Sequence, residues 1–193
     1  MKLAVIFPGV GYHTDKPLLY YSKKLAKEYG FEVRELTYGS SKGTFRGTRE
    51  EMQQAFDSAL VQIETELQDI DFSKYEELLF ISKSLGTAVA PTFARKHHLT
   101  AHNIYYTPVT ESLDYMKQEG IVFTGTSDPF ANMEILKQGC EKLGLPLYIT
   151  EQGNHSLETC NVLDDIKHLS VIMHHTKNYI ESISEANSKE GWL

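Results

Sequence analysis

The sequence has little of what marks an exported or metal-binding protein. Its 193 residues include only two cysteines, Cys140 and Cys160, and no C-x-x-C pair. Two cysteines placed in this way provide neither a disulfide framework nor a zinc-ligand spacing. Because cysteine is this scarce, we expect a reducing, cytoplasmic setting and no bound metal.

Long apolar runs and blocks of positive charge are also missing. The apolar run at the amino terminus, Leu3–Phe7, ends at Pro8 and is too short for a signal peptide or a membrane span. The formal net charge is −7, and no Lys/Arg-rich block occurs. Neither nucleic acid nor a membrane surface is therefore an expected partner. We expect a small-molecule partner, and the sequence indicates no particular oligomeric state.

The composition is that of an ordinary globular protein. Hydrophobic residues make up 41% and charged residues 23% of the chain, which is enough to bury one continuous core. No internal repeat or low-complexity linker divides the chain. We predict a single domain over residues 1–183, followed by a frayed polar tail over residues 184–193.

Short apolar segments alternate with longer segments of helical period, which is typical of βα units around a parallel sheet. The predicted strands are Leu3–Phe7, Glu32–Leu36, Leu78–Ile81, Asn103–Tyr106, Ile121–Thr124 and Leu147–Ile149. The predicted helices are Pro17–Tyr29, Thr48–Gln68, Leu85–Lys96, Phe130–Leu143 and Cys160–Ile183. Several strands are apolar at consecutive positions, as expected where helices cover both sheet faces. The pattern predicts an α/β fold: a three-layer sandwich with about six mainly parallel strands.

A glycine-rich stretch, Tyr38–Gly47, follows the second predicted strand. Its glycines do not have the spacing of a phosphate-binding loop, G-x-x-x-x-G-K-[ST]. We therefore interpret the stretch as a flexible connection near the rim of the site rather than a nucleotide cradle.

The strongest local signal is a small-x-Ser-x-Gly turn that joins an apolar strand to a helix at residues 82–86. Such a turn brings backbone segments close together, so the residues two positions before and after the central serine must be small. Ser82 and Gly86 meet this need, although the first position is usually glycine. The turn predicts Ser84 as a nucleophile, and the alternative is an ordinary helix N-terminus capped by serine.

A nucleophilic serine needs a general base and a carboxylate that orients the base, and both candidates follow later strands. Asp128 comes after the predicted strand 121–124, and His155 lies in the loop after 147–149. The carboxyl ends of parallel strands lie at one edge of a sheet, so the three residues are expected to meet there. Alone, Asp128 fits a helix N-cap and His155 an exposed loop residue, but their order and placement together favour a catalytic triad.

The loop after the first strand, Phe7–His13, is expected at the same edge. Its backbone N–H groups are suited to stabilising an oxyanion, with Val10 as the first donor and Gly11 as the alternative. The second donor is the N–H of Leu85, directly after the nucleophile. Tyr12 and Gly11 are candidate substrate contacts.

Lys83, beside the serine, raises a Ser–Lys dyad as a rival mechanism. Adjacent residues on such a turn point in different directions, so we interpret Lys83 as part of an ion pair at the surface or behind the site. None of the remaining histidines has a recognised zinc spacing such as H-E-x-x-H. Those that cluster are His97, His98, His102, His168, His174 and His175.

With the motifs at residues 8–11, 82–86, 127–129 and 153–155, nearly the whole sequence resembles a compact member of the α/β-hydrolase superfamily. The resemblance implies an ester, thioester or amide substrate, an acyl-enzyme on Ser84, and no cofactor. Two departures stand out. The first two strands of the full family sheet are missing, and the short segment after strand 103–106 leaves no room for a large lid.

Three interpretations of function remain at this point. The leading one is an esterase or thioesterase acting on a small acyl substrate. The second is an acyltransferase with the same triad, and the third is a non-catalytic ligand-binding module that keeps the fold. Intact serine, aspartate and histidine favour an enzyme, because a silent fold has no chemical need for all three.

Overall fold

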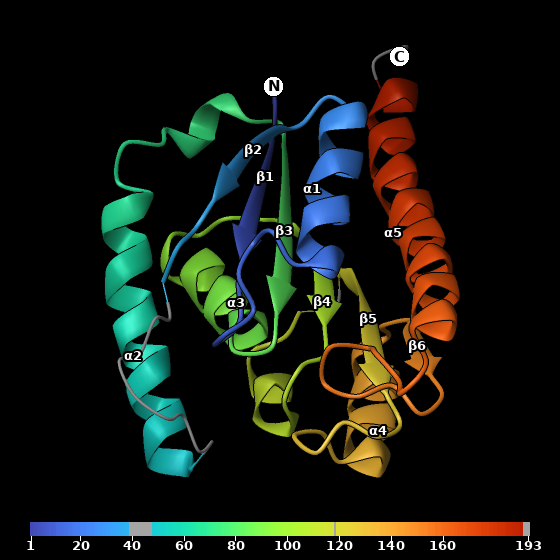
Figure 1. Cartoon of the computed structure of the whole chain (residues 1–193). Coiled ribbons are helices and arrows are strands. Elements are labelled where there is room, and N and C mark those ends of the chain that lie inside the picture. The colour runs from blue at the N-terminus through green and yellow to red at the C-terminus, as the bar shows by residue number, and fades with distance from the viewer. Residues whose placement is uncertain (39–47, 118, 191–193) are drawn as a thin grey trace.

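The computed structural model describes residues 1–38, 48–117 and 119–190. Within them, one six-stranded sheet has the order β2-β1-β3-β4-β5-β6, and all neighbouring strands are parallel. The strands are β1 (Lys2–Phe7), β2 (Glu32–Glu35), β3 (Glu77–Lys83), β4 (His102–Tyr106), β5 (Gly120–Gly125) and β6 (Leu147–Thr150). The predicted three-layer α/β sandwich is confirmed (Figure 1).

The helices are α1 (Pro17–Glu28), α2 (Arg49–Glu66), α3 (Gly86–Lys96), α4 (Met133–Leu143) and α5 (Val162–Glu190), with short 3-10 helices η1 (Phe72–Lys74) and η2 (Thr110–Asp114). Helices α1 and α5 lie side by side on one face of the sheet, and α2, α3 and α4 cover the other (Figure 1). All of β3 and most of β1 are buried because both faces are covered.

Side chains alternate between the two faces along each strand. On β4, Ile104 and Tyr106 pack on the side of α1 and α5, whereas Tyr105 packs with Leu136 and Cys140 of α4. The same alternation on β3 sends Leu79 and Ile81 toward α1 and α5. It also places Lys83, at the end of that strand, on the α1/α5 side.

Two predicted helix boundaries were wrong. Helix α4 begins at Met133 rather than Phe130, because the Asn132 side chain caps it by accepting the N–H groups of Glu134 and Ile135. Asp128 therefore does not cap this helix. Helix α5 continues to Glu190, seven residues past its predicted end at Ile183.

The chain between β4 and β5 is short, and its described part contains only η2. No large cap is inserted there, in agreement with the sequence. Of the predicted glycine-rich connection, Tyr38–Gly47, only Tyr38 belongs to the described residues. No helix in the described ranges is long and apolar enough to cross a membrane.

Candidate active site

Ser84 lies on a sharp turn between β3 and α3. Its φ is +52°, a strained value for a residue with a side chain. The turn is held because the Ser84 N–H donates to the carbonyl oxygen of Tyr106 at 2.9 Å, on the neighbouring strand. This is the geometry that the small-x-Ser-x-Gly pattern predicts for a nucleophile on a strand-to-helix turn.

The small residues on either side of the turn are required by close packing. A Cβ added to Gly86 would lie 2.4 Å from the carbonyl oxygen of Phe7 on β1, which rules out any side chain without movement of the backbone. At the other position Ser82 is fully buried, and its hydroxyl donates to the carbonyl oxygen of Ile104 at 3.1 Å. Serine is therefore tolerated in place of the usual glycine, because its buried hydroxyl has a hydrogen-bond acceptor on β4.

Ser84, His155 and Asp128 form one hydrogen-bonded chain. The His155 Nε2 atom lies 2.8 Å from Ser84 Oγ, and the His155 Nδ1 atom lies 2.7 Å from Asp128 Oδ2. The Asp128 side chain has no exposed surface, and its other oxygen, Oδ1, accepts the N–H of Phe130 at 2.9 Å. The structure thus brings together the three side chains that the sequence analysis selected, from the ends of β3, β5 and β6.

Two glycines allow the loops after β5 and β6 to approach each other. A Cβ on Gly125 would lie only 2.1 Å from the carbonyl oxygen of Gly153. The same carbonyl accepts the N–H of Ser127 at 2.9 Å. The two loops are therefore joined directly beside Asp128 and His155, which fixes the spacing between the carboxylate and the imidazole.

The environment of His155 favours the neutral imidazole. Burial lowers the pKa of His155, and the positive charge of Lys83 lowers it further, while the hydrogen bond to Asp128 opposes both. The ring of Phe130 packs edge-on against the imidazole, with ring centroids 4.8 Å apart. Phe130 is a site residue that the sequence analysis missed, and only its position two residues after Asp128 could have suggested it.

The candidate oxyanion donors lie beside Ser84. Gly9 and Tyr12 pair with each other through two backbone hydrogen bonds, which leaves Val10 and Gly11 at the tip of a tight turn. Gly11 is exposed with a φ of +69°, and a Cβ added to Gly9 would lie 3.0 Å from Ser84 Cβ. Within the described residues, neither the Val10 N–H nor the Leu85 N–H donates to a protein acceptor. The role of these donors remains a prediction.

Two placements differ from those expected. Tyr12 is buried in the core rather than open to substrate, and its hydroxyl accepts the N–H of Leu18 at 3.2 Å. Lys83 is not at the surface: it is 2% exposed, and no carboxylate among the described residues forms an ion pair with it. The side chain instead extends along the α1/α5 side of β3, so the expectation of an ion pair was wrong.

A cavity of about 440 Å³ adjoins the triad. Two of its lining residues connect it to the triad: Leu85 follows the nucleophile, and Phe130 packs against His155. Its lining is mostly apolar, with polar side chains from α2 and η2: Arg49, Met52, Gln53, Phe56, Leu85, Ala88, Val109, Glu111, Ser112, Asp114, Tyr115, Pro129 and Phe130. Ser84 and Asp128 are each next in sequence to a lining residue, and His155 contacts the lining through the ring of Phe130.

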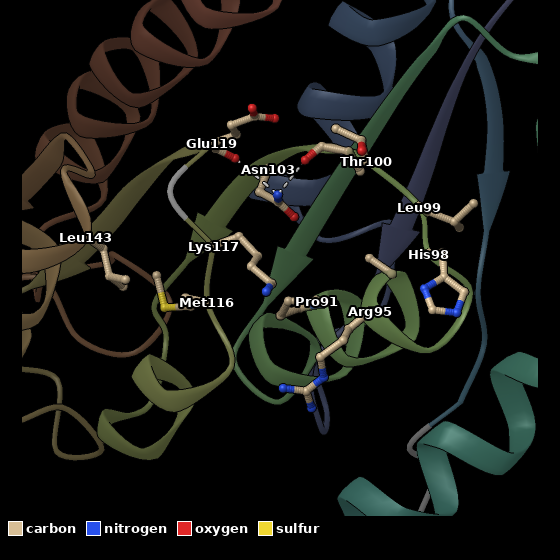
Figure 2. A pocket seen from close by; sticks show the side chains of 12 residues that line it. Pro91, Arg95, His98, Leu99, Thr100, Asn103, Met116, Lys117, Glu119 and Leu143 are labelled. Atoms are coloured by element: carbon tan, nitrogen blue, oxygen red, sulfur yellow. Dashed lines mark hydrogen bonds between the residues drawn. The ribbon is translucent and has the colours of Figure 1, made fainter.

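A second cavity, of about 760 Å³, lies at the opposite edge of the sheet (Figure 2). It opens where β4 and β5 begin and where α3 ends, so it is remote from the triad. Asn103 and Glu119 at its rim are linked by a hydrogen bond from the Asn103 amide to the Glu119 carbonyl oxygen, which Figure 2 shows as a dashed line. No residue selected from the sequence lines this cavity. No group of three metal-ligating side chains occurs in the described part of the chain.

No protein-family model matches the sequence, and no curated protein matches it either. Solved structures are similar, however. An α/β serine hydrolase homologue from Coxiella burnetii is 12% identical with a TM-score of 0.65, over 92% of this chain and 84% of that one. Est1E from Butyrivibrio proteoclasticus, solved with ferulic acid bound, is 12% identical with a TM-score of 0.67, over 94% and 89%. XC6422 from Xanthomonas campestris, an α/β serine hydrolase without a lid, is 13% identical with a TM-score of 0.62, over 94% and 81%.

At these identities the similarity establishes the fold. The chain has the α/β-hydrolase fold, as the resemblance of its motifs implied. The activity of this chain is argued from its own residues below.

Proposed function

We propose that this protein is a serine hydrolase that cleaves small carboxylic esters through an acyl-enzyme on Ser84. The observation that carries the proposal is the continuous hydrogen-bonded chain from Asp128 through His155 to Ser84, with links of 2.7 and 2.8 Å. Both distances lie in the range that proton transfer between a nucleophile and its base requires. The strained φ of Ser84 adds support, because such strain is concentrated at functional sites.

The protonation states follow from the surroundings. The buried Asp128 carboxylate accepts a hydrogen bond from the N–H at Nδ1 of His155, so the neutral imidazole has Nε2 free to accept the proton of Ser84. The lowered pKa of His155 keeps the imidazole neutral at neutral pH. His155 is thus ready to act as a base while Asp128 holds its ring in place.

In the acylation step, Ser84 Oγ attacks the ester carbonyl carbon and its proton passes to His155 Nε2. The C=O π bond breaks, and the carbonyl oxygen becomes an oxyanion near the N–H groups of Val10 and Leu85. When the C–O bond to the alcohol breaks, His155 returns its proton to the leaving alkoxide. The imidazolium formed in between is stabilised by Asp128.

In the deacylation step, water takes the place of the alcohol. His155 removes a proton from the water as it attacks the acyl carbon, and the second tetrahedral intermediate releases Ser84 Oγ, which recovers the proton. The products are a carboxylic acid and the free enzyme. Every proton in the cycle moves through His155 Nε2, so no metal or organic cofactor is needed for the balance.

The cavity beside the triad supports a small acyl group as the substrate. Its volume of about 440 Å³ lies at the small end of typical ligand sites. Met52, Phe56 and Phe130 provide apolar walls that suit a short aliphatic or aromatic chain.

The experiment that tests the proposal is intact-mass spectrometry after incubation with a fluorophosphonate probe, followed by peptide mapping. We expect a single adduct on Ser84 in the wild-type protein and none in Ser84→Ala. Ser127→Ala is the matched control, because it removes an exposed serine beside Asp128 and is expected to label normally. A folded wild-type protein that forms no adduct, or forms it at another residue, contradicts the proposal. A panel of p-nitrophenyl esters of increasing chain length then measures the acyl range.

A further inference from the structure

Lys83, the residue before the nucleophile, is buried without an ion-pair partner in the described residues. It continues the row of Leu79 and Ile81 on β3, and its register partner on β4 is Tyr106. Tyr106 is fully occupied, since its hydroxyl bonds with Ser22 at 2.8 Å and with Thr176 at 2.5 Å. The Lys83 side chain therefore lies among packed side chains on the α1/α5 side of the sheet. It is the charged residue in a row of β3 that otherwise carries the apolar side chains of Leu79 and Ile81.

The ammonium group of Lys83 is placed over an aromatic ring. Its Nζ atom lies 4.9 Å from the ring centroid of Tyr12, a cation–π distance. The ring itself is fixed, because the Tyr12 hydroxyl accepts the N–H of Leu18 at the start of α1. Tyr12 thus serves as a platform for Lys83, which accounts for its burial at a position first expected to contact substrate.

The lysine stem and the nucleophile touch the same loop. A Cβ added to Gly9 would lie 3.1 Å from Lys83 Cδ and 3.0 Å from Ser84 Cβ. Lys83 therefore lies directly beneath the turn that carries Val10, within a few ångströms of the reacting serine. Its charge acts on the site from behind, where solvent screens little.

The charged groups around Lys83 come from three other segments. Asp128, after β5, and Glu158, after β6, attract the ammonium, whereas Lys16, before α1, repels it. Burial is the largest influence and lowers the pKa of Lys83 to about 7. The ammonium is thus charged below neutral pH, in the range where His155 takes up a proton, and its charge lowers the pKa of His155.

We propose that Lys83 is a positioning residue that keeps His155 in its proton-accepting form at mildly acidic pH, by holding a cation over Tyr12, beneath the Gly9 turn and beside Ser84. An unpaired ammonium is costly to bury, so its retention at this position fits an electrostatic role better than a packing role. The cation disfavours a second positive charge on His155 and balances the negative charge of Asp128. The kinetic part of this inference rests on the proposed function, whereas its effect on His155 itself does not.

The test is Lys83→Met, which keeps an unbranched stem beneath the Gly9 turn and removes the charge. The first readout is the pKa of His155 from an NMR titration of its imidazole, which needs no turnover. We expect the pKa of His155 to rise by roughly half a unit or more in Lys83→Met, because a buried like charge has been removed. Thermal unfolding checks that the variant is folded.

The second readout is the pH profile of kcat/KM with a p-nitrophenyl ester. The acid limb of Lys83→Met is expected to move to higher pH by the same amount, which for a half-unit shift lowers its rate by up to about threefold at pH values well below the pKa of His155. The two profiles are expected to converge toward pH 8, because His155 is in its neutral form in both proteins there. A purely structural role would lower the rate at every pH and leave the midpoint in place.

Lys16→Met is the matched control. Lys16 Nζ also lies over the Tyr12 ring, at 5.2 Å, but its side chain is only half-buried. Solvent screens that charge, so we expect no shift in the pKa of His155 beyond about 0.2 units. A shift of that small size, or a downward shift, in folded Lys83→Met overturns the inference. If the pKa of His155 moves but no ester is hydrolysed, Lys83 keeps its role and the proposed hydrolase activity fails.

Discussion

Two cavities at opposite edges of the same sheet differ in size and in chemistry. The one at the amino ends of the strands has a volume of about 760 Å³, against about 440 Å³ at the carboxyl ends. Yet the smaller cavity adjoins the Ser84–His155–Asp128 chain. Between these two cavities, the hydrogen-bonded side chains identify the candidate site, and the larger volume does not.

The difference follows from how polar groups are used at each edge. At the amino edge, the Asn103 amide donates to the carbonyl oxygens of Ala101 at 2.8 Å and Glu119 at 3.1 Å, so it closes backbone connections. At the carboxyl edge, the His155 imidazole joins two other side chains. An amide that satisfies the backbone stabilises the fold, whereas an imidazole between a carboxylate and a hydroxyl is able to move a proton.

The sharpest test of this comparison removes the reacting groups at the carboxyl edge. Ser84→Ala and His155→Ala are each expected to lower kcat/KM for p-nitrophenyl acetate by about 10⁴-fold or more, because the nucleophile and base act as one unit. Initial rates with circular dichroism as a folding control measure the effect. Near-normal turnover in a folded Ser84→Ala protein would mean that the carboxyl edge is not where the chemistry occurs.

The orienting carboxylate gives the next largest effect. Asp128→Asn keeps the shape of the side chain and the acceptor for Phe130, but its amide no longer stabilises a proton on Nδ1 of His155. We expect kcat to fall by about 10²–10⁴-fold with little change in thermal stability. Stopped-flow measurement of acylation and deacylation shows whether both steps slow, as expected for a group that acts through His155. A loss confined to KM would place Asp128 in substrate binding instead.

Much of this edge was predictable from the sequence because strand order and strand ends determine it. Ser84, Asp128 and His155 each follow an apolar strand, and parallel strands bring such positions together. The turn at Ser82 and Gly86 was also predictable, since a close backbone approach tolerates only small residues there. These are local rules that a single sequence expresses directly.

The misplaced residues depend on packing between segments distant in sequence. From the sequence alone, Lys83 is expected at the surface or in an ion pair, because nothing in the sequence shows that the Tyr12 ring, from another loop, packs beside it. Tyr12 reads as a substrate contact until its hydroxyl meets the N–H of Leu18. Phe130 becomes part of the site only because the loop that carries His155 folds against it. No pattern within the sequence encodes these three contacts.

A substitution in the wall of the carboxyl-edge cavity sharpens the comparison. Met52 on α2 lines that cavity and is partly buried. Met52→Trp adds bulk there, so we expect the kcat/KM for hexanoyl esters to fall at least about tenfold while that for acetyl esters changes little. The ratio of the two rate constants is the measurement. An unchanged ratio would show that the acyl group lies outside this cavity.

The smallest effect is expected from the same change at the other edge. Leu99 lines the larger cavity and is also partly buried, so Leu99→Trp is a matched partner for Met52→Trp. Because no part of the Ser84–His155–Asp128 chain reaches that edge, we expect kcat/KM for both esters to stay within about twofold of wild type. A chain-length-dependent loss in folded Leu99→Trp would mean that the larger cavity takes part in substrate binding. The two tryptophan variants together therefore decide whether the acyl group binds in the cavity beside the triad or in the larger cavity at the opposite edge.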